Sequence, residues 1–202
     1  MRRVAEGLLL DDVIEKTGSV QHGSAMPRLL LHVCCAPCAS HVLEYLSGYF
    51  CISAYFCNPC IKPREEYFKR AHQLSRLVSL MDYPNLENVI VCDYNVEEFD
   101  SFASGMMGEP EGGERCTLCF TQRLGKTAER AKQDGFDVFA TTLSISPHKN
   151  AALINEIGSG IASGSGADYL ISDFKKRGGF QRSIAISKKL GIYRQSYCGC
   201  VP

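Results

Sequence analysis

Short apolar runs alternate with segments of helical periodicity along most of this chain, and this alternation is its strongest constraint on fold. Five runs have the length and flanking turn residues of buried strands, at 29–33, 52–56, 88–92, 136–142 and 169–172. Helices are expected between and after them, at 40–49, from Pro63 to Met81, over 117–133, after Pro147 and over 183–190. Strand–helix–strand units form right-handed crossovers, so the pattern predicts a single-domain α/β protein, with a parallel sheet and helices on both faces.

The two ends of this pattern set the expected domain organisation. Residues 1–27 show no sustained period, so we expect an N-terminal extension there, in which a short helix near residues 5–16 is an option. One domain is expected over residues 28–202. The glycine-rich acidic segment 93–114 predicts a loop with one short helix.

Composition indicates a folded protein that does not enter a membrane. The 202 residues are 45% hydrophobic and 22% charged, which is typical of globular chains and excludes disorder throughout. No apolar run approaches the roughly 18 residues of a spanning helix. The first apolar run ends at Asp11-Asp12, too early for a secretory signal, so a cytoplasmic protein is expected.

Charge is balanced overall, with 22 basic and 22 acidic residues, but it is unevenly distributed. Residues 87–114 contain eight acidic residues and no Lys or Arg, whereas residues 173–194 contain seven basic residues and one acidic residue. The basic stretch is a candidate phosphate-binding patch, and a solvated helix face is the alternative.

Eleven cysteines are the unusual feature of the composition. In a cytosolic chain this density indicates metal or redox chemistry rather than a disulfide framework. Most of them fall in short clusters, namely Cys34-Cys35-x-x-Cys38, Cys57-x-x-Cys60, Cys116-x-x-Cys119 and Cys198-x-Cys200. Cys51 and Cys92 stand alone in apolar strands and are expected to be small core residues.

The predicted topology brings several thiols to one edge of the sheet. Cys34, Cys57 and Cys92 each lie at the end of a predicted strand, where open α/β sheets bind their ligands. A CxxC at a helix start favours the thiolate, which binds metals and attacks disulfides. Four thiolates suit zinc or an iron–sulfur cluster, so a structural zinc protein, an iron–sulfur enzyme and a thiol–disulfide oxidoreductase all remain open. Cys198-Gly199-Cys200 can also form a strained, redox-active disulfide.

Six motifs resemble the QueH-type epoxyqueuosine reductases and together span about residues 28–202. They are LLLHVCCAPC (29–38), FCNPCIKPREEY (56–67), EGGERCTLC (111–119), TTLSISPHK (141–149), SDFKK (172–176) and YRQSYCGC (193–200). The resemblance implies reduction of epoxyqueuosine in tRNA to queuosine, a [4Fe-4S] cluster with an additional iron ion in some members, and an external electron donor. It also implies a sheet related to the PP-loop and adenine nucleotide alpha hydrolase folds, here with cysteines in place of the phosphate loop.

Carried over by motif, the resemblance implies Cys34, Cys35, Cys116 and Cys119 as cluster ligands. Cys198 and Cys200 would be a redox-active pair or, with Cys38, ligands of a second iron. Cys57 and Cys60 depart from the family pattern, in which these positions are usually not thiols, so their role is left open as incidental, as a separate metal site or as competing ligands.

Epoxide reduction also needs a proton donor and a binding surface for tRNA. Candidate acids are Asp93, His148 and Tyr197, with Lys149 as a further possibility, whereas His32 lies inside a strand and is expected to be a core residue. A further set of basic residues is expected to contact tRNA: Lys149, Lys175, Lys176, Arg177, Arg182 and Arg194. Tyr67, Phe174 and Tyr197 are candidates to stack on an extruded base, with a core role as the alternative.

Overall fold

The computed structural model describes residues 8–9, 12, 26–106 and 108–200. The strands are β1 (Leu8–Leu9), β2 (Arg28–His32), β3 (Cys51–Phe56), β4 (Leu86–Val91), β5 (Val138–Thr141) and β6 (Asp168–Ile171). The helices are α2 (Ala36–Leu46), α3 (Arg64–Leu80), α4 (Val96–Phe102), α5 (Glu114–Asp134), the 3-10 helix η1 (Thr142–Ile145), α6 (Ala151–Ser165) and α7 (Gly179–Lys189).

All strands run parallel in one sheet with the order β1-β6-β5-β2-β3-β4. This confirms the predicted α/β class and the five expected strands, and α4 is the short helix expected in the acidic segment. One expectation needs correction. Leu8–Leu9 pairs with Leu170 and Ile171 as an edge strand, because β6 offers free backbone groups there, so these two residues are not helical. Of the other residues in the helix expected near 5–16, the structure describes Asp12 alone, and that residue is helical, as expected.

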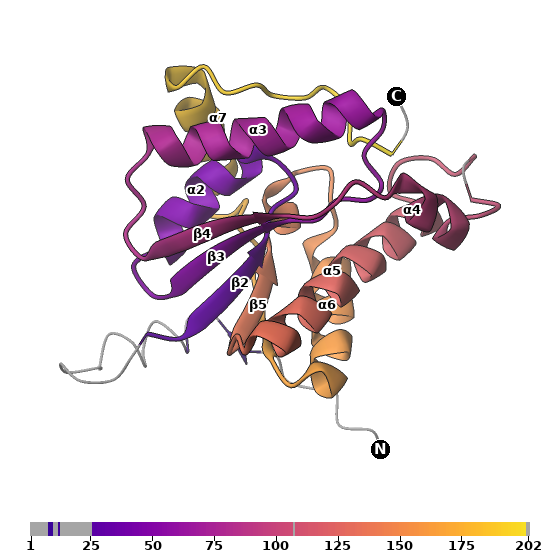
Figure 1. The fold of residues 1–202 in the computed structure, drawn as a ribbon, viewed down its shortest axis with the longest axis horizontal. Helices are drawn as coiled ribbons and strands as arrows, with labels where there is room; N and C mark the ends of the chain where they lie inside the picture. Colours follow the sequence, from indigo (N-terminus) through magenta and orange to yellow (C-terminus); the bar gives the residue numbers. More distant parts are fainter. Residues whose placement is uncertain (1–7, 10–11, 13–25, 107, 201–202) are drawn as a thin grey trace.

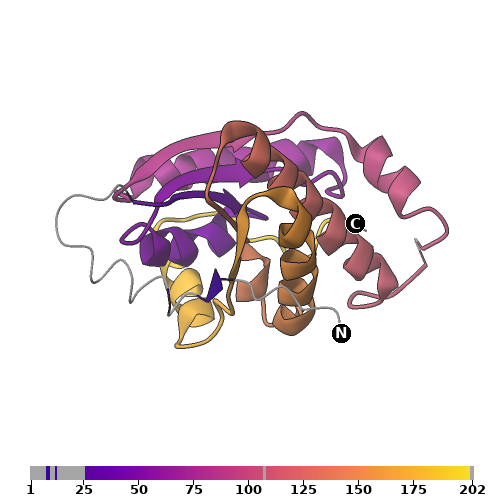
Figure 2. The ribbon, with the colours of Figure 1, turned by 90° about the horizontal axis from the view of Figure 1, so that it is seen from below.

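Helices cover both faces of the sheet, as Figures 1 and 2 show. On one face, α2 and α3 pack over β2, β3 and β4 and α7 packs against α2, and on the other α5 and α6 lie side by side. Side chains alternate between the faces along each strand, so Leu29 and Leu31 of β2 enter the core under α2, whereas Leu30 enters the core under α5.

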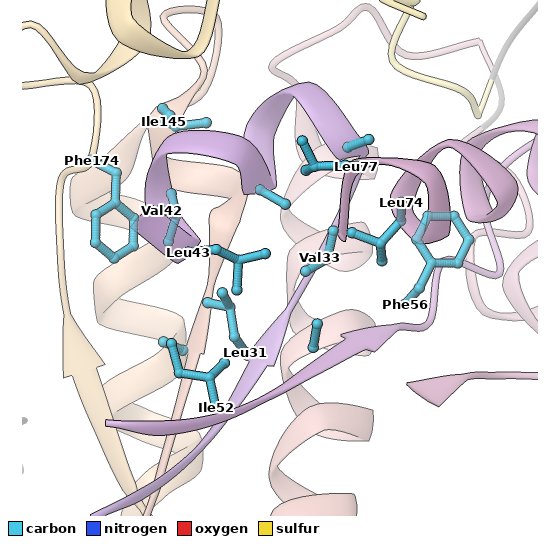
Figure 3. Packing of buried hydrophobic residues seen from close by; sticks show 14 of the residues in the cluster. Leu31, Val33, Val42, Leu43, Ile52, Phe56, Leu74, Leu77, Ile145 and Phe174 are labelled. Carbon is cyan, nitrogen blue, oxygen red and sulfur yellow. The ribbon is translucent and has the colours of Figure 1, made fainter. Parts of the chain in front are cut away.

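The core under α2 and α3 consists of closely packed aliphatic and aromatic side chains. Figure 3 shows Leu31 and Val33 of the central strand against Val42 and Leu43 of α2, with Phe56 beside Leu74 farther along the sheet. This packing fixes the start of α2 relative to the end of β2. Among the described helices, none combines the length and apolar character that crossing a bilayer requires.

The strand order places a topological switch point between β2 and β5. The chain proceeds from β2 outward to β3 and β4, then returns to the other side of β2 to form β5 and β6. The loops that leave β2 and β5 therefore diverge to opposite faces and open a crevice at the carboxyl edge of the sheet. These loops begin at Val33 and at Thr142, and a hydrogen bond from Cys34 N–H to Thr142 Oγ1 (3.1 Å) joins them.

Candidate active site

Three cysteines occupy the loop that leaves the central strand at this switch point. Cys35 is the N-cap of α2, and its sulfur accepts a hydrogen bond from the Cys38 backbone N–H at 3.3 Å. The sulfurs of Cys34, Cys35 and Cys38 lie within 4.8 Å of one another. We call these three residues the loop thiols. A short, tight turn into a helix with Pro37 in its first turn is what brings them together.

The loop thiols differ in acidity because of their mutual contacts. The hydrogen bonds of Cys34 with Cys35 and Cys38 hold the pKa of Cys34 well below its ordinary value. Burial raises the pKa of Cys35 to about 12. The hydroxyl of Thr142 also donates to Cys34 Sγ at 3.4 Å. Cys34 is thus the thiol of the three that most readily supplies a thiolate.

A second set of sulfurs lies where α5 meets the C-terminal tail, and we call Cys60, Cys116, Cys119, Cys198 and Cys200 the tail-side thiols. Cys119 interacts with Cys60 and Cys198, and Cys200 with Cys198, Cys60 and Cys116. The guanidinium of Arg123, four residues after Cys119 on α5, contacts Cys60 Sγ. The hydrogen bond with Cys119 and the charge of Arg123 lower the pKa of Cys60 to about 6 against the effect of burial.

Helix α3 holds the tail in place. Arg70 donates from Nη1 to Cys198 O (2.8 Å) and from Nη2 to Tyr197 O (3.3 Å), and its Nε bonds to Glu66 Oε1 (2.6 Å). The Gly199 carbonyl accepts from Lys62 N at 2.8 Å. Gly199 has φ = 126°, and a side chain there would meet Arg70 and Ile61 at 3.1 Å, so the tail requires glycine at this position.

A cavity of about 380 Å³ opens between the loop thiols and the tail. Cys34, Cys38 and Cys198 line it. Four cationic side chains also line it, Arg70, Arg123, Lys149 and Arg194, against one carboxylate, Glu111. Although burial opposes it, the neighbouring Cys198 and Cys34 raise the pKa of Lys149, so that residue is a cation. The cavity thus combines thiols with positive charge.

The basic residues expected to bind tRNA divide into two groups. Lys149 and Arg194 line the cavity. Lys175 forms an ion pair with Asp173 (2.7 Å), with Lys176 farther from the same carboxylate (3.9 Å), and Arg182 pairs with Glu44 through Nε (2.9 Å). These three cations have protein partners outside the cavity lining, and Arg177 is exposed on the surface.

The candidate acids likewise divide into residues that line the cavity and one that does not. Tyr197 and His148 line the cavity, and the Tyr197 hydroxyl donates to Lys62 O at 3.0 Å. Asp93 is exposed after β4 and is not among the cavity residues.

Of the aromatic candidates for base stacking, only Tyr197 is placed at the cavity. Tyr67 and Phe174 are buried in the core, so the core alternative is correct for both. Phe180, which the sequence analysis did not single out, also lines the cavity, with Arg194 over its ring.

His32 is a core residue, as expected. It is fully buried between Thr141 Oγ1 (2.8 Å) and Asn58 Oδ1 (3.2 Å). Burial and the charge of Arg123 lower its pKa to about 4, so the ring is neutral.

Two expectations about isolated cysteines need correction. Cys51 and Cys92 are both partly exposed rather than core residues, Cys92 because it follows the edge strand β4. Cys57 and Cys60 do not act as a pair either. Cys57 interacts with Cys92 on the α5 face, whereas Cys60 belongs to the tail-side thiols.

Two further cavity residues, Arg70 and Arg123, were also not predicted from the sequence, and each is no more than 2% exposed. A signal was available for both. Arg70 stands four residues after Glu66, so helical spacing places its positive charge beside a carboxylate. Arg123 stands four residues after Cys119, so the same spacing places it beside a candidate metal ligand.

The donor set of the site suits a soft metal centre. Among the described residues, the group found able to hold a metal ion is the loop thiols. Clustered thiolates favour zinc and iron–sulfur clusters over magnesium or calcium, which prefer oxygen ligands. Of the tail-side thiols, Cys198 lines the same cavity as Cys34 and Cys38 and offers a further donor of the same kind. The residues present therefore fit a thiolate-ligated metal centre.

Comparison with known proteins identifies close relatives. The model of the family described as "Epoxyqueuosine reductase QueH" matches residues 29–201. A protein of that name from Streptococcus pyogenes is 43% identical, covering 95% of this chain and 76% of the relative. A Staphylococcus aureus relative is 40% identical over 95% of this chain and 82% of its own length. A Thermotoga maritima relative is 35% identical over 87% of this chain and 90% of its own length.

Proposed function

The chain belongs to the QueH family of epoxyqueuosine reductases, and on that premise we propose that it is an oxidoreductase that converts epoxyqueuosine to queuosine at the wobble position of tRNA. This would be the last step of queuosine biosynthesis, in the cytoplasm. The observation that carries the proposal is the cationic cavity at the switch point, with thiols in its wall. Residues 28–202 would form the reductase domain and residues 1–27 an extension.

The proposed cofactor is a [4Fe-4S] cluster. Cys34, Cys35, Cys116 and Cys119 would hold it, and Cys38, Cys198 and Cys200 would serve as a redox-active pair or as ligands of an additional iron ion. When bound, the cluster would relay the two electrons that epoxide reduction needs, from an external donor. Support comes from the clustering of the loop thiols and from the interaction of Cys119 with Cys60 and Cys198.

The protein's own side chains would bind the nucleotide and supply protons. Lys149 and Arg194 would contact anticodon-loop phosphates, because both line the cavity. Tyr197 would stack on the extruded base or act as acid, with His148 as the alternative acid, whereas Asp93, the third candidate acid, is not among the residues that line the cavity. The oxygen leaves as water, so two protons must reach it, and the Lys149 ammonium is a further source.

Cysteine variants of the anaerobically purified protein test the cofactor assignment. We expect Cys34→Ala and Cys116→Ala each to lower iron and sulfide content and to abolish conversion of epoxyqueuosine. Cys51→Ala is the matched control, because Cys51 is a partly exposed cysteine at the opposite end of the sheet, and it should retain both. Full iron content and activity in the Cys116 variant would remove that residue from the ligand set, and stoichiometric zinc without iron would contradict the proposed chemistry.

Binding measurements over a range of salt concentrations test the tRNA contacts. Lys149→Met and Arg194→Met should each weaken binding and reduce the salt slope by about one. Lys176→Met is the control, because Lys176 lies outside the cavity lining and is largely exposed. If the control changes binding as much as the cavity variants do, the tRNA contact surface lies along 173–177 instead.

A further inference from the structure

Cys57 and Cys92 form a thiol pair outside the proposed reductase site. They directly follow β3 and β4, which are hydrogen-bonded neighbours. The last registered residues are Phe56 and Val91, and Cys92 N–H donates to Phe56 O at 3.0 Å. The strand register therefore continues to place Cys57 opposite Cys92.

Both thiols lie on the same face of the sheet. Cys57 belongs to the buried cluster under α5 and α6, together with Tyr55 two residues before it, and the partly exposed Cys92 packs against that cluster. Neighbouring strands are about 4.8 Å apart, within the range of about 4.4–6.8 Å between the Cα atoms of a disulfide. The two thiols already interact in the reduced protein. A bond between them therefore requires little movement of the backbone.

The two cysteines differ in exposure and acidity, as a reactive and a resolving thiol do. Cys92 is partly exposed, whereas Cys57 is 5% exposed. The hydrogen bond with Cys57 lowers the pKa of Cys92 to about 7, and Tyr55, Lys126 and Arg130 act in the same direction against the effect of burial. The same interaction raises the pKa of Cys57. An accessible thiol with thiolate character beside a buried protonated one is the arrangement that favours thiol–disulfide exchange.

We propose that Cys57 and Cys92 are a reversible dithiol–disulfide site that reacts with low-molecular-weight disulfides, separate from the reductase cavity. The Cys92 thiolate attacks one sulfur of the small disulfide, forms a mixed disulfide and releases one thiolate. Cys57 then loses its proton to water and attacks Cys92 Sγ, which expels the second small thiolate. The net reaction oxidises the two cysteines to one disulfide and reduces one small disulfide to two thiols, and excess small thiol reverses it.

Oxidised glutathione is the probe for the anaerobic, metal-loaded protein. After acid quenching and alkylation, tandem mass spectrometry of unreduced digests locates the bonded cysteines. In the unmodified chain we expect a Cys57–Cys92 disulfide that reduced glutathione reverses. In Cys57→Ser we expect glutathione to remain bound at Cys92, because the resolving thiol is missing. In Cys92→Ser, Cys57 should stay unmodified because it is buried.

Cys51→Ser is the matched control, since Cys51 is another partly exposed cysteine on β3, at its opposite end. It should form the Cys57–Cys92 disulfide like the unmodified chain. Cys57→Ala provides the same trap if the serine variant does not fold. The proposal fails if Cys92 remains reduced in the unmodified chain, or if neither Cys57 variant retains glutathione at Cys92. These readouts require no turnover, so they stand apart from the test of reductase activity.

Discussion

Replacing Arg70 tests how the fold holds the cysteine-bearing tail against the cavity. Arg70 is 2% exposed and joins α3 to the tail through two main-chain carbonyls, those of Cys198 and Tyr197, while it neutralises the buried Glu66. Arg70→Met keeps most of the side-chain volume and removes all of these donors. Among the described residues, the Glu66 carboxylate then keeps the Tyr193 hydroxyl, which donates to Glu66 Oε1 at 3.2 Å.

The expected cost follows from burial. Removing one partner of a buried ion pair destabilises a protein by about 3–5 kcal/mol, because the other charge stays buried. One kcal/mol shifts Tm by about 2–4 °C in a domain of this size, so the loss is roughly 6–20 °C. Arg76→Met is the matched control on the same helix. Arg76 also donates to two carbonyls, Gly191 (2.7 Å) and Leu190 (3.2 Å), but near the surface, so its loss should cost about 1 kcal/mol.

Calorimetry and hydrogen exchange measure the two effects. In Arg70→Met, exchange of backbone amides in the tail should rise, and Cys200, now 7% exposed, should be alkylated faster. In Arg76→Met these tail readouts should change little. If the two variants lose the same stability, or if the tail amides of the Arg70 variant exchange at the unmodified rate, Arg70 does not hold the tail.

Three further predictions concern the core and the thiols. Gly158→Ala should lower the free energy of unfolding by about 1–3 kcal/mol, because the new methyl group would lie 2.5 Å from the Tyr169 ring. Denaturant titrations measure this change, and unchanged stability would contradict the close packing. The rate of Cys92 alkylation should have a pH midpoint near 7, because the hydrogen bond with Cys57 lowers the pKa of Cys92. Cys57→Ala should move this midpoint to higher pH, and an unmoved midpoint would rule out the interaction between the two thiols. The lowered pKa of His32, about 4, means that the unfolded state binds more protons below pH 6.5, so stability should fall by about 3 kcal/mol as pH drops from 6.5 through 4. The His32→Gln variant should lose this part of the pH dependence, measured as unfolding free energy against pH.

Periodicity was sufficient to predict the sheet, since each strand–helix unit has its own local signal, and it placed Cys34 and Cys35 at the ligand-binding edge. Three features needed the tertiary structure. Strand β1, described over Leu8–Leu9, depends on pairing with β6. The separation of Cys57 from Cys60 depends on the alternation of side chains at the end of β3, which directs Cys57 toward α5. Arg70 contacts residues more than 120 positions away in the chain, and no local pattern contains such a contact.

Reduction of epoxyqueuosine in the thiol-lined cavity is the proposed activity of the protein. The most direct measurement is mass analysis of the nucleosides of tRNA that carries epoxyqueuosine, after incubation with the anaerobically prepared, iron-loaded protein and a chemical reductant. We expect conversion of epoxyqueuosine to queuosine, with loss of one oxygen atom, and no conversion by the Cys34→Ala variant. Unchanged epoxyqueuosine with a fully iron-loaded protein, or equal conversion by that variant, would contradict it.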